Sequence, residues 1–235
     1  MSAAAQVQRT PIQNLWNLWF KSMGWTADYR EPDFTKYIVI VWPHTSNLDF
    51  FIGFIFSRAY ALPQPHFLAK KSSFVGPVGW LGRKVGGIPV DRSKSNNFVD
   101  QVAAEFNRRD KFVLAVTPEG TRTKTDYWKS GFYYMAMAAD VPVVMATIDF
   151  PTKHITYGAW FKPSGDLEAD MDIIRKHYAG AKGRHPERQG EIRVRPPEAR
   201  PLDARPPEAR PLDAPPADAP PAETRIPEPE GQTQG

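Results

Sequence analysis

Short apolar segments alternate with helix-like segments along most of this 235-residue chain, and this alternation limits the folds available to it. The β-branched and aromatic run at residues 37–42 predicts a buried strand, and the apolar segment at residues 50–56 predicts a helix. Further strands are predicted at residues 66–70, 87–90, 112–116, 141–150 and 154–160, and further helices at residues 78–85, 96–109, 128–139 and 167–178. Strands that alternate with helices predict an α/β fold, in which helices flank a layered mixed sheet.

The link between the first predicted strand and its helix carries His44 and Asp49. Along a continuous helix, five residues turn two side chains about 140° apart, so these two meet only if the histidine lies in the loop and the aspartate in the first helical turn. Ser46 and Asn47 are good N-cap residues, and a helix that begins there gives this geometry. An aspartate that accepts from one ring nitrogen leaves the other nitrogen to take a proton from a hydroxyl. Alternatively, Asp49 only stabilises a helix N-terminus and His44 is an ordinary loop residue.

Two further segments carry polar residues at the ends of predicted strands. In residues 86–92, paired glycines including Gly87 allow a ligand to approach the backbone, and Arg92 offers a planar group suited to phosphate. In residues 117–122, Glu119, Gly120 and Arg122 follow a buried strand, where sites collect in α/β folds. The alternative for both segments is a polar turn with a surface ion pair.

The predicted helix at residues 12–24 has one continuous apolar stripe. Its members are Ile12, Leu15, Trp16, Trp19, Phe20 and Met23. Two tryptophans on this stripe suit a helix that lies in a membrane interface, and the alternative is a helix packed on the protein's own core. No signal peptide and no apolar run of membrane-spanning length are visible, so we expect no membrane crossing.

Composition changes at residue 195. The last 41 residues hold 12 of the 24 prolines and two copies of one decapeptide, at residues 195–204 and 205–214. Such a segment buries too little apolar surface to offset its ordering entropy, and we predict that it is extended and disordered. Its 5 arginines and 8 acids give a net charge of −3, whereas residues 1–194 hold 25 basic and 18 acidic residues, a net of +7.

The basic part of the chain indicates an anionic partner, which is a membrane surface, a phosphorylated substrate or a nucleic acid. No nucleic-acid-binding signature is present, which makes nucleic acid the weakest of the three. The absence of cysteine excludes disulfides, thiolate metal sites and a cysteine nucleophile. The five histidines lack metal-ligand spacing, so we predict no metal site.

Four of these segments, in this order and spacing, resemble the motifs of the glycerolipid acyltransferases, over about residues 12–190. The pattern is most similar to the bacterial 1-acylglycerol-3-phosphate acyltransferases, also called the lysophospholipid acyltransferase family. The matching segments are His44-x-x-x-x-Asp49, Gly87-Ile-Pro-Val-Asp-Arg92, Pro118-Glu-Gly-Thr-Arg122 and Val141-Pro142-Val143. The Pro-rich segment lies outside this pattern.

The resemblance implies that His44 acts as general base on the hydroxyl of a lysophospholipid and that Asp49 orients it. The hydroxyl attacks the thioester of acyl-CoA or acyl-carrier protein, and no metal or cofactor takes part. The resemblance also implies phosphate binding by Arg92 and Arg122. The remaining implied site residues are Gly87, Glu119, Gly120 and Thr121 around the phosphate, and Val141 and Pro142 along an acyl or acceptor channel.

We therefore expect an N-terminal, membrane-interfacial helix at residues 1–25, an acyltransferase domain at 26–190 and a Pro-rich tail at 191–235. The expected location is peripheral, on the inner face of the cytoplasmic membrane. The expected acceptor is 1-acylglycerol 3-phosphate, with lysophosphatidylcholine or lyso-ornithine lipid as alternatives. A non-catalytic lipid-binding or scaffold protein is a second class of function. A phosphoester hydrolase is a third, but it needs a metal cluster or a nucleophile that the sequence does not offer.

Overall fold

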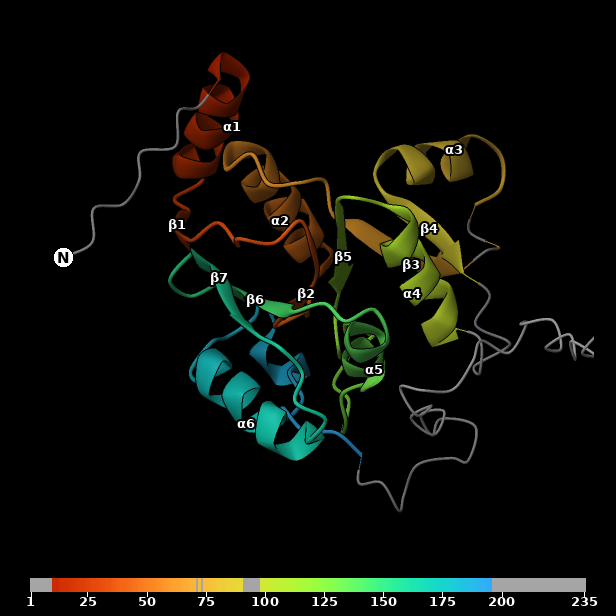
Figure 1. The fold of residues 1–235 in the computed structure, drawn as a ribbon. Coiled ribbons are helices and arrows are strands. Elements are labelled where there is room, and N and C mark those ends of the chain that lie inside the picture. The colour runs from red at the N-terminus through yellow and green to blue at the C-terminus, as the bar shows by residue number, and fades with distance from the viewer. Residues whose placement is uncertain (1–9, 71, 73, 91–97, 196–235) are drawn as a thin grey trace, which may run out of the picture. The chain divides into compact units, whose positions relative to one another are not determined.

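The computed structural model of this protein describes residues 10–70, 72, 74–90 and 98–195. Within these ranges the chain forms six α-helices and seven strands (Figure 1). The helices are α1 (Pro11–Ser22), α2 (Asn47–Ala59), α3 (Gly76–Lys84), α4 (Phe98–Arg108), α5 (Gly131–Ala138) and α6 (Leu167–Tyr178). The strands are β1 (Thr26–Tyr29), β2 (Lys36–Trp42), β3 (His66–Lys70), β4 (Gly87–Val90), β5 (Phe112–Val116), β6 (Val143–Asp149) and β7 (His154–Phe161).

All seven strands belong to one sheet, with the order β1-β7-β6-β2-β5-β3-β4. Strands β6, β2, β5, β3 and β4 run parallel to one another, whereas β7 is antiparallel to β6. The predicted α/β fold with a mixed sheet is therefore confirmed. Strand β1, which pairs with β7, is not predicted by the sequence, because its four residues are short of apolar side chains and alternate between exposed and half-buried positions.

The two faces of the sheet are covered by different helices. On one face, Ile38 and Ile40 of β2 pack with buried side chains of α4, α5 and α6. On the other face, Tyr37 and Val39 pack with buried side chains of α1 and α2. This alternation follows from the period of two along a strand, and it makes β2 the centre of a three-layer structure.

Strands β2 and β5 are parallel neighbours, with Ile40 beside Val116. The loops that follow them, residues 43–46 and 117–122, therefore leave the sheet at the same edge. In α/β sheets, ligands bind at this carboxyl edge.

Helix α1 has two apolar sides with different environments. Phe20 is fully buried and its ring packs against Phe56 of α2, which agrees with the alternative of a helix packed on the core. Ile12, Leu15 and Leu18 are each about two-thirds exposed, so a second apolar side of this helix has no cover. None of the helices in the described part of the chain has the length and apolar character that a bilayer span requires.

The folded part of the chain extends past the predicted domain boundary at residue 191. Val194 is buried in the core, and the backbone N–H of Trp128 donates to the carbonyl of Arg193 at 2.7 Å. Residues 193 and 194, which the expected domain bounds assign to the tail, therefore pack on the folded part. The Pro-rich segment from residue 196 onward lies outside the described residues.

Candidate active site

His44 and Asp49 lie where β2 leads into α2. Their side chains meet, with 3.1 Å between His44 Nδ1 and Asp49 Oδ2. The same oxygen accepts the backbone N–H groups of Thr45 at 2.8 Å and Ser46 at 2.9 Å. Ser46 in turn caps α2, because its Oγ accepts the N–H of Leu48 at 3.1 Å. This capping box fixes Asp49 in the first helical turn, while His44 stays in the loop.

The environment of the pair determines which ring nitrogen of His44 is available. The Asp49 side chain is only 2% exposed, and its carboxylate is an acceptor, so the Nδ1 position carries the proton. Among the described residues, none bonds to His44 Nε2, and the ring is one-fifth exposed. A neutral imidazole with a free Nε2 can accept a proton from a hydroxyl that reaches it.

Glu119 lies behind the His44 loop rather than in front of it. Its side chain is 2% exposed, and Oε2 accepts the backbone N–H of His44 at 3.0 Å. Burial raises the pKa of this carboxyl, while the N–H groups of His44 and Gly190 and the indole of Trp42 act in the opposite direction. Glu119 therefore holds the loop in place from the interior, and the sequence does not reveal this inward orientation.

The loop after β5 brings three further predicted residues to the same edge. Gly120 has a φ of +64°, a conformation that favours glycine, and its N–H closes a turn on Thr117 at 2.9 Å. Thr121 is half-buried and its hydroxyl bonds that of Thr123 at 2.9 Å. Arg122 is exposed and forms no ion pair with any residue that the structure describes, so its guanidinium is available to an anion.

Three predicted site residues lie elsewhere. Gly87 begins β4, two strands away from β5 and level with Ala115, and a Cβ there would lie 2.7 Å from the ring of Phe74. Its lack of a side chain thus serves packing. Val141 and Pro142 precede β6, five to six residues before Thr147, which pairs with the last residue of β2, or roughly 16–20 Å at the rise per residue of a strand, and Val141 is buried in the core. A role of Val141 and Pro142 in a channel stays a prediction. Arg92 lies outside the described residues.

The C-terminal strap, which we define as residues 181–195, contacts both loops of the site. The N–H of His185 donates to Thr45 Oγ1 at 3.1 Å, and Thr45 is fully buried. Gly190 packs so closely against the loop after β5 that a Cβ would lie 2.1 Å from the carbonyl oxygen of Thr125. Sequence reasoning missed these contacts, because they join residues 65 to 140 positions apart and no local pattern marks them.

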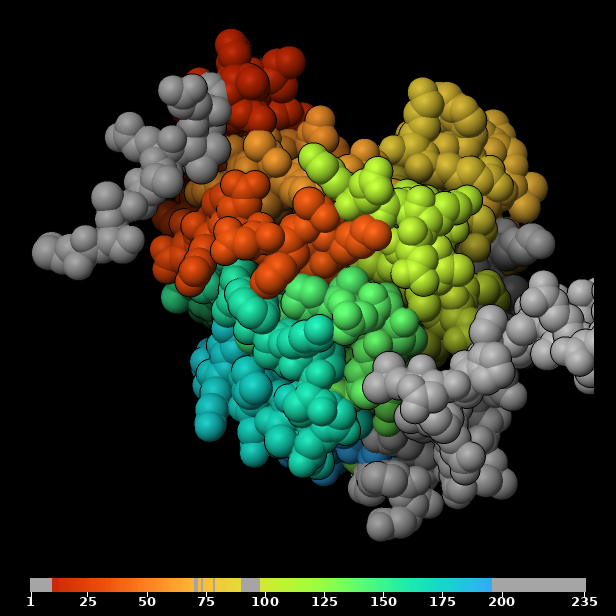
Figure 2. Space-filling view, in the orientation of Figure 1, coloured from red at the N-terminus to blue at the C-terminus, as the bar shows by residue number. Residues whose placement is uncertain are grey.

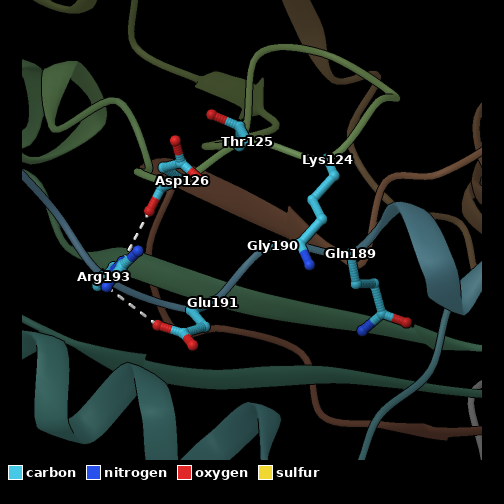
Figure 3. A pocket seen from close by; sticks show the side chains of 7 residues that line it. All are labelled: Lys124, Thr125, Asp126, Gln189, Gly190, Glu191 and Arg193. Atoms are coloured by element: carbon cyan, nitrogen blue, oxygen red, sulfur yellow. Dashed lines mark hydrogen bonds and ion pairs between the residues drawn. The ribbon is translucent and has the colours of Figure 1, made fainter.

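A polar pocket of about 240 Å³ lies where the strap meets the loop after β5 (Figure 3). Arg193 closes one side of it, where its Nε donates to the carbonyl of Asp126 at 2.8 Å and its Nη1 lies 3.3 Å from a carboxylate oxygen of Glu191. The lining residues are Lys124, Thr125, Asp126, Gln189, Gly190, Glu191 and Arg193. None of them has a large apolar side chain, so this pocket does not suit an acyl chain.

Two truncations separate the strap from the Pro-rich segment. Removal of all residues after Gly190 should lower the melting temperature by several degrees and reduce activity, because Val194 leaves the core and the Arg193 contacts to Asp126 and Trp128 are lost. Removal of all residues after Arg195 is the matched control and should leave both quantities unchanged. Thermal unfolding and turnover are measured for each. Equal melting temperatures for the two truncations would contradict a structural role of residues 191–195.

Comparison with known proteins gives one match. A family model described as "Acyltransferase" matches residues 27–149, which is more than half of the chain. No curated protein and no solved structure matches the chain. The matched segment contains His44, Asp49, Glu119 and Arg122, whereas the strap lies beyond it.

Proposed function

This chain belongs to the acyltransferase family, and on that basis we propose that it transfers a fatty acyl group from a thioester to the free hydroxyl of a lysophospholipid. The observation that carries this proposal is the His44–Asp49 pair, which leaves Nε2 of His44 free at the carboxyl edge of the sheet. The donor is acyl-CoA or acyl-carrier protein. The acceptor that we propose first is 1-acylglycerol 3-phosphate, whose product is phosphatidate.

The proposed reaction needs one base and no acyl-enzyme. His44 Nε2 takes the hydroxyl proton while the acceptor oxygen bonds to the thioester carbonyl carbon. The tetrahedral intermediate then collapses with cleavage of the C–S bond, and the imidazolium returns its proton to the departing thiolate. Asp49 stabilises the imidazolium between these steps, and its three hydrogen bonds hold the ring in one orientation. Because a thioester is already activated, positioning and one base supply the required acceleration.

A phosphorylated acceptor fits the charge at the site. Arg122 is exposed at the carboxyl edge without an ion pair among the described residues, and a guanidinium binds phosphate through two parallel hydrogen bonds. Arg92 lies outside the described residues and comes two positions after the end of β4 in the sequence, and we propose it as a second phosphate ligand. The net charge of +7 on residues 1–194 favours anionic lipid in general.

We also propose that the protein works as a peripheral enzyme on the inner face of the cytoplasmic membrane. The uncovered side of α1, with Ile12, Leu15 and Leu18, supports this location, and Trp19 beside them is 41% exposed. Such a helix lies in the interface plane with its apolar side among the lipid chains.

The test is incubation of purified full-length protein with labelled acyl-CoA and a panel of lysolipids in vesicles. The panel contains lysophosphatidate, lysophosphatidylcholine and lyso-ornithine lipid, and acyl-carrier protein serves as a second donor. Product from lysophosphatidate alone supports the full proposal. Product from another acceptor would support the mechanism and identify that lysolipid as the acceptor in place of 1-acylglycerol 3-phosphate. No product from either donor with any acceptor would contradict acyl transfer to lysolipids and favour the lipid-binding alternative.

Replacement of Arg122 tests the phosphate site. Arg122→Ala should raise the KM for lysophosphatidate by about tenfold or more, because a charge-assisted hydrogen bond to phosphate is lost. The effect should be much smaller for an acceptor without a phosphate monoester. Arg58→Ala, an exposed arginine in the last turn of α2, is the matched control. An unchanged kcat/KM for lysophosphatidate in Arg122→Ala would show that Arg122 does not bind the phosphate.

A further inference from the structure

Helix α3 carries a second uncovered apolar surface, which the proposed function does not use. Val75, the N-cap residue of α3, is 73% exposed. Within the helix, Trp80 is 59% and Leu81 is 56% exposed. Val85, which follows the last turn, is 36% exposed. Exposed tryptophan and leucine on adjacent positions are uncommon on a free protein surface and mark sites of interaction.

The packing of α3 explains why these side chains remain outside. The helix contacts the rest of the protein through glycines that surround the buried ring of Phe74. A Cβ at Gly79 would lie 2.2 Å from the backbone of Phe74, and one at Gly82 would lie 3.3 Å from its ring. Among the side chains that the structure describes, Gly79 and Gly82 form the inner side of the helix, and Trp80 and Leu81 remain exposed.

Charge identifies the kind of surface that would cover these side chains. Arg83 and Lys84 occupy the last turn of α3, and Lys84 Nζ lies over the ring of Trp80 at 4.3 Å. Residues 66–90 contain no aspartate or glutamate. Tryptophan next to lysine and arginine is typical of protein segments at the boundary between lipid chains and anionic headgroups.

The position of α3 relative to α1 supports the same partner. Both helices project beyond the sheet on the same side of the folded part, at the top of Figures 1 and 2, and a hollow separates them in the space-filling view. Helix α2 starts at the His44–Asp49 pair, and Phe50, Phe51 and Phe54 on its first two turns are 40–57% exposed. Trp19 of α1 packs edge-on against Phe51. An apolar surface thus continues from α1 along α2 to the catalytic loop.

We propose that α3 is a second membrane-binding element, which inserts Trp80 and Leu81 among the headgroups of an anionic bilayer. Together with α1 it would attach the protein to the bilayer at two points. The purpose of this attachment rests on the proposed function, but vesicle binding by α3 can be measured without any turnover. Helices α1 and α3 are separate, and both can contact one planar bilayer at the same time. A protein partner usually binds through one contiguous patch, which suits two separated helices less well.

The first experiment uses the absence of cysteine in the chain. Leu81→Cys is labelled with an environment-sensitive fluorophore, and Ile173→Cys, a 42% exposed apolar position on α6, is the matched control. Each labelled protein is mixed with phosphatidylcholine vesicles that contain or lack phosphatidylglycerol. We expect a blue shift and stronger emission for the label at position 81 with anionic vesicles, and no change at position 173. A vesicle-bound protein whose label at position 81 does not respond would overturn the proposal.

The second experiment separates membrane attachment from catalysis. The double variant Trp80→Gln/Leu81→Gln should bind anionic vesicles about tenfold more weakly than the native protein, whereas Ile173→Gln should bind normally. Turnover of a short-chain acceptor that is dissolved as monomers should be unchanged in the double variant, and turnover of vesicle-embedded acceptor should fall. Normal vesicle binding by the folded double variant would overturn the proposal. If the double mutation weakened self-association and left vesicle binding unchanged, the surface would instead contact a second copy of the chain. Lack of turnover in all variants would contradict the proposed function and leave the binding result valid.

Discussion

Replacement of His44 by alanine is expected to reduce kcat by about 10²–10⁴-fold, the contribution typical of a positioned general base. His44 Nε2 is the free ring nitrogen at the carboxyl edge of the sheet, and its removal leaves the acceptor hydroxyl without a proton acceptor. The ring is one-fifth exposed and adds little to the core, so the melting temperature should change by no more than a few degrees. Steady-state turnover of lysophosphatidate with acyl-CoA, together with thermal unfolding, measures both quantities.

A second histidine–aspartate pair provides the matched control for this result. His154 Nε2 lies 3.3 Å from Asp28 Oδ2, but this aspartate is 85% exposed and the pair belongs to β7 and β1. His154→Ala should therefore leave kcat unchanged. Near-normal turnover by purified His44→Ala protein would rule out the general-base mechanism, and an equal loss in both variants would point to a general effect on folding.

The local geometry of the site was predictable because its determinants are close in sequence. Ser46 is a strong N-cap residue, the apolar run before it ends at Trp42, and Asp49 stands three positions after the cap. These signals together place His44 in the loop and Asp49 in the first turn of α2. The bounds of α6 also agree with the prediction, since residue 167 follows an aspartate N-cap and the apolar period continues to residue 178.

The remaining contacts of the site were not predictable, because they depend on how distant segments pack. Glu119 was expected to face a ligand, yet it accepts the backbone N–H of His44 in the loop after the neighbouring strand β2. Gly87 was expected to admit a ligand, yet it accommodates the ring of Phe74. A glycine or a buried acid gives the same sequence signal for either purpose, and only the tertiary structure distinguishes them.

The apolar pattern of α1 shows a similar limit. A stripe of apolar residues predicts that one side of a helix is covered, but it does not identify the cover. In the structure Phe20 contacts α2 and is fully buried, while Leu15 on the same predicted stripe is 68% exposed. Leu18, which lies off that stripe, is as exposed as Leu15 and widens the uncovered side. Periodicity alone therefore could not separate the packed side from the side that we assign to the membrane.

Replacement of Asp49 by asparagine is expected to reduce kcat by about 10²-fold with little change in KM. Three N–H groups point to the single oxygen Oδ2, from His44 Nδ1, Thr45 and Ser46, and the amide oxygen of asparagine can accept all three. The orientation of the ring is then retained, but the negative charge that stabilises the imidazolium is lost. Because Asp49 is buried behind His44 and does not face the acceptor, substrate binding should be unaffected.

The same replacement should also lower stability, for a separate reason. Asp49 Oδ1 is buried and has no hydrogen-bond partner among the described residues, so the amide NH₂ of asparagine would occupy a position without an acceptor. An unsatisfied buried donor costs about 1–3 kcal/mol, which corresponds to a melting temperature lower by several degrees. Asp166→Asn is the matched control, since Asp166 also accepts two backbone N–H groups at a helix N-terminus but lies far along the chain from His44. If kcat of Asp49→Asn matched that of the native enzyme, the carboxylate would serve only the helix cap, and His44 would act without a charged partner.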